Sequence, residues 1–176
     1  MEEKEDPIFE IVTIGNPVLT QKSEKIEDID QEIRELAQGM VRTMYAAPGI
    51  GLAAPQVDRG IQLITIDLSV GEKSNDLIIL ANPEILHQEG ESILEEGCLS
   101  VPGVNEKVTR PYRIVVKGMD LDGKERIFEV EDLLARVFCH EIDHVNGKLF
   151  IDHLSPLKKS LIRKKLQKQR EKDEFK

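Results

Sequence analysis

The sequence is poor in cysteine and has no long apolar run. Its two cysteines, Cys98 and Cys139, are too few for a disulfide framework, so each is a candidate buried thiol, metal ligand or nucleophile. No stretch approaches the roughly 18 consecutive apolar residues of a membrane-spanning helix. Residues 1–7 are acidic and polar, unlike a signal or transit peptide. These absences predict a cytoplasmic protein with no membrane partner.

The composition predicts one globular domain that spans residues 1–176. Hydrophobic residues make up 40% of the 176 residues and charged residues 32%, which is typical of a folded chain with a sizeable core. The chain contains no internal repeat and no low-complexity linker that would divide it into parts. We therefore expect a single catalytic or binding unit.

Hydrophobic periodicity predicts a helix first and then several strands. A helical stripe of apolar residues runs from about Ile29 to Tyr45, before Pro48 and Gly49. Runs rich in β-branched and aliphatic residues predict strands at Ile61–Asp67, Leu77–Ala81, Tyr112–Met119 and Glu125–Val130, with a hairpin turn at Asp122-Gly123. Glycine and proline predict irregular backbone in the segments Gly49–Gln56 and Glu95–Gly103.

Two further helices are predicted in the C-terminal third. The first covers about Glu131 to Val145 and stops before Gly147. The second covers about residues 155–174, with Ser155 as its cap and Pro156 as its first residue. A helix, a set of antiparallel strands and two helices make an α+β domain.

The segment His140-Glu141-Ile142-Asp143-His144 is an H-E-x-x-H motif within the second predicted helix. At about 100° per residue, positions four apart lie on the same face of a helix, so both imidazoles can bind one metal ion. Glu141 lies about a quarter turn away and can handle a proton beside that ion. The alternative is a set of ordinary polar side chains, but the helix is otherwise apolar and would have to satisfy them.

A catalytic metal site of this kind typically needs a third protein ligand. Two classes of zinc peptidase take a histidine six residues after the motif or a glutamate about twenty residues after it. Phe150 occupies the first position, and Lys158–Gln169 contains no acid. Cys139 lies about a quarter turn from the metal-facing side and is expected to be a packed thiol, which leaves Cys98 as the third ligand.

The other polar residues near the motif have ordinary interpretations. Asp143 is either a surface acid or a hydrogen-bond partner of a ligand histidine. His87 and His153 belong to no pattern and are expected to be ordinary polar residues.

Three segments together resemble the peptide deformylase family. They are Gly49-Ile50-Gly51-Leu52-Ala53-Ala54-Pro55-Gln56, Glu96-Gly97-Cys98-Leu99-Ser100 and the H-E-x-x-H segment, and they occur in the family's order. Two positions depart from the family's usual pattern: Cys139 stands in place of glutamine and Asp132 in place of glycine. The resemblance implies antiparallel sheets packed around a central metal-binding helix, with an N-terminal and a C-terminal helix.

The resemblance also implies an activity, which is removal of the N-formyl group from formyl-methionyl nascent peptides with release of formate. It implies one divalent ion per chain, with Fe(2+) as the usual native metal; a Cys/His site also suits Zn(2+), Ni(2+) or Co(2+). By resemblance, the side-chain amide of Gln56 and the backbone N–H of Leu99 stabilise the developing oxyanion, beside Glu141. The alternatives from the residues themselves are a zinc peptidase or a non-catalytic, metal-containing module that binds nascent chains.

The peptide is expected to add as a strand along Gly49, Ile50 and Gly51. By resemblance, further substrate contacts involve Glu96 and Gly97, and the methionine side chain lies against Ile50, Leu94 and Leu133. Ordinary core packing is the competing explanation for these three aliphatic residues.

Charge is distributed unevenly along the chain. Residues 158–176 contain nine Lys/Arg and three Asp/Glu, a local charge of +6, whereas the whole chain has a net charge of −9. The basic final helix resembles the ribosome-docking extension of some family members, so ribosomal RNA is a possible partner. A solvated amphipathic helix is the alternative, and no feature points to DNA.

Overall fold

The computed structural model of the chain describes residues 7–175, and these have the predicted α+β architecture. The helices are α1 (Gln31–Ala46), α2 (Asp132–Val145) and α3 (Pro156–Glu174), together with the short 3-10 helices η1 (Pro17–Thr20), η2 (Ala54–Val57) and η3 (Phe150–His153). The strands are β1 (Gly51–Ala53), β2 (Leu63–Ile66), β3 (Ile78–Glu89), β4 (Ser92–Cys98), β5 (Val101–Arg110), β6 (Arg113–Met119) and β7 (Glu125–Glu131).

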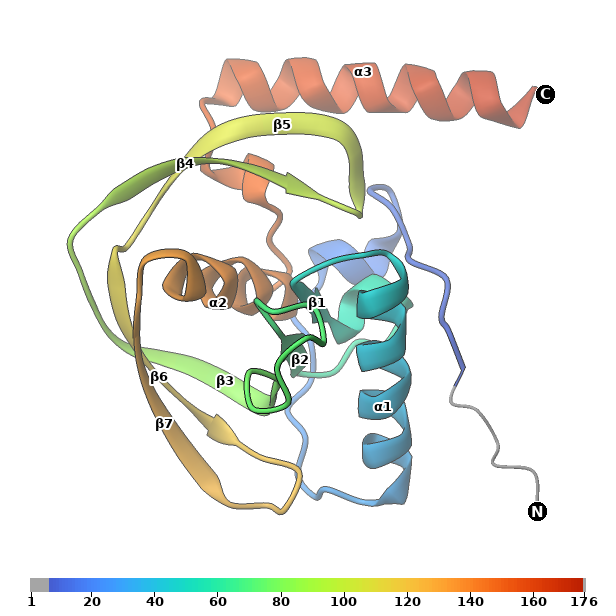
Figure 1. Cartoon of the computed structure of the whole chain (residues 1–176). Helices are drawn as coiled ribbons and strands as arrows, with labels where there is room; N and C mark the ends of the chain where they lie inside the picture. The colour runs from blue at the N-terminus through green and yellow to red at the C-terminus, as the bar shows by residue number, and fades with distance from the viewer. Residues whose placement is uncertain (1–6, 176) are drawn as a thin grey trace.

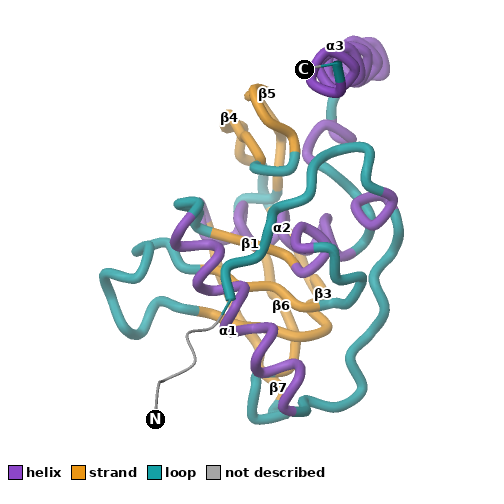
Figure 2. The backbone as a smooth tube through the Cα atoms, turned by 90° about the vertical axis from the view of Figure 1, so that its right-hand side faces the viewer, coloured by secondary structure: helices purple, strands orange, loops and turns teal. Residues whose placement is uncertain are grey.

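The strands form two antiparallel sheets around α2. Five of them pair in the order β1-β2-β3-β6-β7, and β4 pairs with β5 separately. In Figure 1, α2 lies between the larger sheet and the β4–β5 pair, and α1 lies beside β1 and β2. Figure 2, turned by 90°, shows the β4–β5 pair standing apart from the larger sheet, with α3 end-on beyond it. The central position of α2 confirms the expected arrangement.

The predicted helices are confirmed at nearly the expected residues. The side chain of Asp30 caps α1 by accepting a hydrogen bond from the backbone N–H of Ile33 at 2.9 Å. Ser155 caps α3 in the same way, accepting from Lys158 N, and Pro156 is the first helical residue. No helix within residues 7–175 is long and apolar enough to cross a membrane.

Helix α2 buries one face against the larger sheet. Its residues Val137, Phe138, Ile142 and Val145 share a cluster with aliphatic residues of that sheet. A second cluster packs α1 against β1 and β2, and a third joins the N-terminal segment, β5, η3 and α3. Because the apolar face of α2 is fixed against the sheet, its opposite face must point toward β4 and β5.

Two segments predicted to be irregular are in fact largely regular, so those predictions were wrong. Residues 95–103 belong mostly to β4 and β5, which pair along their length and are joined by Leu99 and Ser100. The register shifts between Gly97 and Cys98, so the glycine marks a bulge rather than the end of the strand. The segment Gly49–Gln56 likewise contains β1 and most of η2.

Strand β3 is longer than predicted. It continues through Asn82-Pro83 to Glu89, with a register shift between Ala81 and Glu84. Asn82 has φ of +52°, and its side chain forms two hydrogen bonds with the backbone of Ile26, at 2.8 and 2.7 Å. A partner 56 residues away therefore stabilises a bulge where the local sequence predicts a break.

The helix stop at Gly147 is confirmed. Gly147 has φ of +77°, and a Cβ atom there would lie 2.8 Å from the backbone carbon of Gln21 and 2.9 Å from the Thr20 carbonyl oxygen. The chain that leaves α2 is therefore in close backbone contact with the segment after η1. This contact fixes the end of the helix that carries His144.

We predict that Gly147→Ala destabilises the fold more than Gly123→Ala does. Both glycines have φ of +77°, but among the described residues nothing lies within 4 Å of a Cβ atom at Gly123. The free energy of unfolding of the Gly123 variant should fall by about 1 kcal/mol, because alanine is disfavoured in a left-handed backbone conformation. The Gly147 variant should lose at least about 1 kcal/mol more, because two backbone atoms must move. Urea unfolding measures both, and equal losses would show that the contact with residues 20 and 21 is unimportant.

Candidate metal centre and active site

The two histidines of the H-E-x-x-H motif meet on the face of α2 that points toward β4. The Nε2 atoms of His140 and His144 are 3.2 Å apart, as their spacing of four residues predicts. His144 is almost completely buried, whereas the ring of His140 reaches the cavity described below. The helix thus directs two imidazole nitrogens to one point.

Cys98 joins them from the end of β4. Its Sγ atom is 3.4 Å from Nε2 of His144. Within residues 7–175, Cys98, His140 and His144 are the one group of three or more potential ligands whose donor atoms all lie within 4.8 Å of one another. Cys139 belongs to the core cluster on the opposite face of α2, where burial raises the pKa of its thiol to about 11. The structure therefore supports Cys98 over Cys139 as the third ligand.

These three side chains fit a divalent transition metal. One sulfur and two imidazole nitrogens form a donor set that suits such ions, and three protein ligands leave a position open. The other ring nitrogen of His140, Nδ1, lies 2.9 Å from Oε1 of Glu96, so the Nε2 lone pair can face the centre. Phe150, at the position of the missing third histidine, instead stacks on the His140 ring with centroids 6.2 Å apart.

Glu96 is the centre of a buried ionic network that the sequence did not reveal. Arg110 of β5 donates to both oxygens of its carboxylate, at 2.9 Å each, and Arg136 of α2 donates to Oε2. All three residues are less than 10% exposed. Burial by itself raises the pKa of Glu96, but hydrogen bonds from Arg110 and His140 more than offset it and hold the pKa well below its usual range. The carboxylate is therefore charged while it holds the His140 ring.

The network continues from Arg110 to the surface. Nη1 of Arg110 donates to Oδ2 of Asp143, which lies 2.7 Å from Nε2 of His153. His153, which the sequence predicted to be an ordinary polar residue, therefore belongs to this network. Asp143 was expected to be either a surface acid or a partner of a ligand histidine, and it is neither. Its carboxylate is partly buried and binds Arg110.

Glu141 lies beside the metal-binding group with one free carboxylate oxygen. The residue is 3% exposed, and its Oε2 atom has no hydrogen-bond partner among residues 7–175. Burial raises the pKa of this carboxyl to about 7. A Cβ atom at Gly51 would lie 2.6 Å from Oε1, so only glycine lets β1 approach this closely. Glu141 can therefore exchange a proton near neutral pH beside the backbone of β1.

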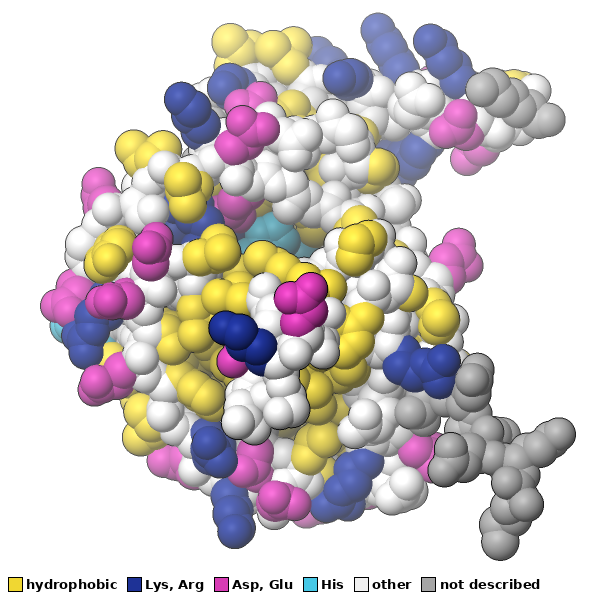
Figure 3. All heavy atoms as spheres, viewed as in Figure 1, with side chains coloured by type: hydrophobic (Ala, Val, Ile, Leu, Met, Phe, Trp, Pro, Cys, Tyr) yellow, Lys and Arg dark blue, Asp and Glu magenta, His cyan; other side chains and the backbone are white. Residues whose placement is uncertain are grey.

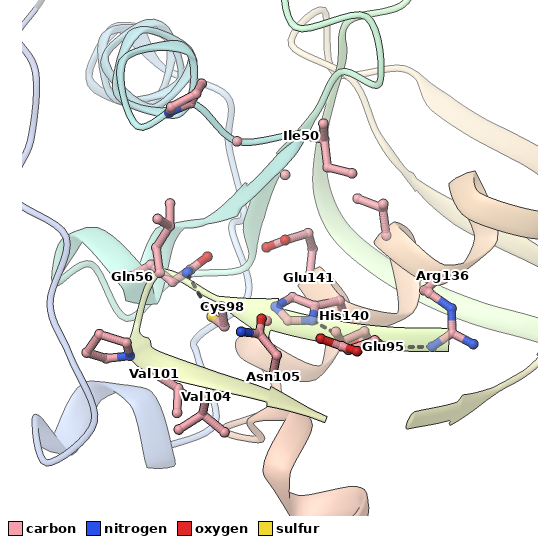
Figure 4. Close-up of a pocket in the computed structure, with 18 of the residues that line it drawn as sticks. Ile50, Gln56, Glu95, Cys98, Val101, Val104, Asn105, Arg136, His140 and Glu141 are labelled. Atoms are coloured by element: carbon pink, nitrogen blue, oxygen red, sulfur yellow. Dashed lines mark hydrogen bonds and ion pairs between the residues drawn. The ribbon is translucent and has the colours of Figure 1, made fainter. Parts of the chain in front are cut away.

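The side chain of Gln56 is held in a single orientation. Its Oε1 accepts a hydrogen bond from the backbone N–H of Ala53 at 3.0 Å, so its Nε2 amide group points toward Cys98 and Ser100. In Figure 4, Gln56, Cys98, His140 and Glu141 converge from β1–η2, β4 and α2. The amide is a donor directed at the region of the candidate metal centre.

A cavity of about 550 Å³ opens above these residues. Figure 3 shows a histidine side chain in a hollow of the surface, among hydrophobic side chains. Most of the predicted site residues line the cavity: Gly49, Ile50, Gly51, Gln56, Glu96, Gly97, Cys98, Leu99, Leu133, His140 and Glu141. Leu94 is 44% exposed and is not among the lining residues, and His144 lies beneath them. Arg136 and Asn105 also line it, although no sequence pattern indicated them.

Asp132 shows how the chain accommodates its departure from the family motif. The residue has φ of +57°, a backbone conformation that glycine adopts most easily and aspartate tolerates better than most residues. Its backbone N–H donates to the carbonyl of Tyr112 at 2.8 Å. The glycine-to-aspartate change therefore preserves the start of α2.

An α+β fold with a central H-E-x-x-H helix, a cysteine donor and an adjacent buried acid defines a metal-binding hydrolase. A sequence profile of the polypeptide deformylase family matches residues 8–160. The peptide deformylase of Thermodesulfovibrio yellowstonii is 49% identical over 158 residues, which cover 90% of this chain and 96% of that protein. The chain belongs to the peptide deformylase family, whose members remove the N-formyl group from nascent peptides.

Solved structures agree with this assignment. The peptide deformylase of Legionella pneumophila matches with a TM-score of 0.87 at 41% identity, covering 96% of this chain and 99% of that one. The enzyme of Ehrlichia chaffeensis, in complex with actinonin, matches with a TM-score of 0.84 at 36% identity, covering 93% and 98%. The fold of this chain is therefore the peptide deformylase fold.

We predict that Cys98→Ser weakens metal binding and that Cys139→Ser does not. Loss of a residue that merely orients a ligand costs about 10- to 100-fold in affinity, so loss of the ligand itself should cost more than about 10-fold. Competition with a chelator, using zinc as the probe, measures both affinities. Equal affinities in the two variants would remove Cys98 from the ligand set.

Proposed function

We propose that this enzyme hydrolyses the N-formyl group of formyl-methionyl peptides at a metal held by Cys98, His140 and His144. The observation that carries the proposal is the convergence of these three donors beside the free carboxylate oxygen of Glu141, at the base of a cavity bordered by β1. We further propose that residues 1–176 form a single catalytic unit and that it acts in the cytoplasm, where nascent chains emerge.

The proposed native ion is Fe(2+), and the same donors also suit Zn(2+), Ni(2+) or Co(2+). The chemistry that a divalent ion supplies at such a site is Lewis acidity, which makes water nucleophilic near neutral pH. The remaining steps belong to side chains of the protein. The ring of His140 is fixed by a hydrogen bond to Glu96 and by packing against Phe150.

Glu141 is the proposed general base and acid. It takes a proton from the attacking water as the oxygen bonds to the formyl carbon, and it delivers a proton to the amine as the C–N bond breaks. A carboxyl pKa raised to about 7 by burial matches both roles. The Nε2 amide of Gln56 and the backbone N–H of Leu99 are the proposed donors to the developing oxyanion. One such donor contributes about 10²- to 10³-fold in rate.

The peptide is proposed to extend along the free edge of β1. This strand is at the end of the five-stranded sheet, so one of its edges has no strand partner in the described part of the chain. The carbonyl of Ile50 accepts a hydrogen bond from the backbone N–H of Asp67, so it points toward β2. Because the backbone groups of successive residues in a strand point to opposite edges, the N–H and carbonyl of Gly51 point to the cavity side. Backbone bonds of this kind suit substrates that share a first residue and vary afterwards. Ile50 and Leu133 are the proposed contacts of the methionine side chain.

Glu141→Gln is predicted to keep the metal and to lose at least about 100-fold in turnover, because the amide cannot accept the proton. Formate release from formyl-Met-Ala-Ser, measured anaerobically together with metal content, checks this. If the fully metallated wild-type protein released no formate, the deformylase proposal would fail. If Glu141→Gln lost the metal, Glu141 would be a ligand instead.

Ribosomal RNA is proposed as the partner of α3. Lys164, Lys165 and Lys168 are exposed on this helix, and Figure 3 shows Lys and Arg side chains along it at the top of the view. Leu166 on the same helix is buried in the third core cluster, so one face anchors α3 to the body while the basic residues remain free. Such an exposed basic helix can bind phosphates in a salt-dependent way.

Reversing the charge of Lys164, Lys165 and Lys168 to glutamate should weaken co-sedimentation with ribosomes about 10-fold at low salt. The matched control makes the same change in net charge on the β6–β7 hairpin, at the exposed Lys124 and Arg126 and the half-buried Lys117. Equal weakening in both variants would indicate a general charge effect and would rule out docking through α3.

A further inference from the structure

A fully buried carboxylate lies at the end of β2, outside the metal centre. Asp67 is 0% exposed, and it accepts four hydrogen bonds. Two come from Ser69, through its backbone N–H at 2.9 Å and its hydroxyl at 2.7 Å, and one from the N–H of Gly71 at 3.1 Å. The fourth comes from the hydroxyl of Tyr45 at 2.5 Å. A buried charge needs such a complete set of donors, so the arrangement is built for an ionised Asp67.

Asp67 joins three separate segments. Tyr45 is the penultimate residue of α1, and its ring packs against Gly71, where a Cβ atom would lie 3.4 Å from Cζ. The backbone N–H of Asp67 donates to the carbonyl of Ile50 at 2.9 Å. The loop between Ser69 and Gly71 contains Val70 at φ of +53°, a strained conformation for a β-branched residue that the bonds to Asp67 hold in place.

Of the three segments that Asp67 joins, the one that contains Ile50 is the backbone of Gly49, Ile50 and Gly51. It is held at two points: the N–H of Gly49 donates to the carbonyl of Met44 in α1 at 2.7 Å, and the carbonyl of Ile50 accepts from Asp67. Gly51 lies directly against Glu141, so the strand cannot move toward α2 without a clash. The bonds to α1 and Asp67 therefore hold the chain just before β1, and the pairing with β2 holds the strand itself.

We propose that Tyr45 is a positioning residue, whose hydroxyl acts through Asp67 to fix the edge of β1 along which the peptide binds. This rests on the proposed function. Neither Tyr45 nor Asp67 lines the cavity of about 550 Å³, so neither touches the substrate there. The effect of Tyr45 is on binding of the peptide backbone rather than on the reacting atoms.

The protonation states are consistent with this role. Burial, together with the bond to Asp67, raises the pKa of Tyr45 to about 12, so the hydroxyl remains a donor at neutral pH. Burial by itself raises the pKa of Asp67. The hydrogen bonds from Tyr45 and Ser69 lower this pKa by more, so the carboxyl pKa is below its usual value. The pair therefore stays a phenol and a carboxylate across the physiological range.

The test compares Tyr45→Phe with Tyr112→Phe, the same change at the only other tyrosine in the sequence, which is 41% exposed. Two substrates are used: formyl-Met-Ala-Ser, which has a following backbone to pair with β1, and formyl-methioninamide, which lacks one. In Tyr45→Phe, the KM for the tripeptide should rise about 3- to 10-fold with kcat within about twofold, which is about what loss of one typical hydrogen bond costs. The KM for the amide should change less, and Tyr112→Phe should match the wild type.

Amide hydrogen exchange gives a second measurement that does not depend on activity. In metal-loaded Tyr45→Phe, the amides of Ile50, Gly51 and Leu52 should exchange at least about threefold faster, with no change in Tyr112→Phe. If the wild type were inactive but this acceleration occurred, the proposed function would fail and the positioning role would stand. Unchanged exchange in Tyr45→Phe would overturn the role.

The steady-state data can also contradict the proposal. Equal losses of kcat/KM on both substrates, without a rise in KM specific to the tripeptide, would mean that Tyr45 is merely structural. If Tyr45→Phe does not fold, Ser69→Ala removes another donor from the same carboxylate and should shift the tripeptide KM in the same direction. An unchanged tripeptide KM in Ser69→Ala would then count against control of β1 by Asp67.

Discussion

The site depends on one buried carboxylate, Glu96. It binds Arg110 of β5, Arg136 of α2 and the ring of His140 at once, so it connects both strands of the small sheet to the central helix. A buried charge of this kind costs several kcal/mol to desolvate and is stable only when every partner is present. Because Cys98 follows Glu96 by two residues on β4, the network that fixes Glu96 also brings the cysteine to the helix.

Helix α2 can occupy the centre of the protein because its two faces have different partners. One face packs against the larger sheet through aliphatic and aromatic side chains. The other carries the two histidines and Arg136, which would be costly to bury without the charges and donors of β4 and β5. The small sheet therefore supplies the polar surroundings that let a helix bearing a metal site be buried.

The opposite wall of the cavity depends on small residues and backbone contacts. At Gly51 the backbone of β1 comes close to Glu141, where any side chain would collide with the carboxylate. Asp67 and Tyr45 hold the same strand from the side away from the cavity. The carboxylate of Glu141, fixed in the helix, and the backbone edge of β1 thus face each other. In the proposed function, this arrangement gives the peptide a defined place relative to Glu141.

The sequence by itself determined what depends on local spacing and on motif order. A spacing of four positions from His140 to His144 places both rings on one helix face. The caps and stops of the helices follow from residues such as Ser155 and Gly147, and the three motifs indicated the family. Only the tertiary structure decided the pairing of β4 with β5, the contacts of Arg110 and His153, and the exposure of Leu94. These features come from contacts between residues far apart in the chain, which periodicity and turn signals do not encode.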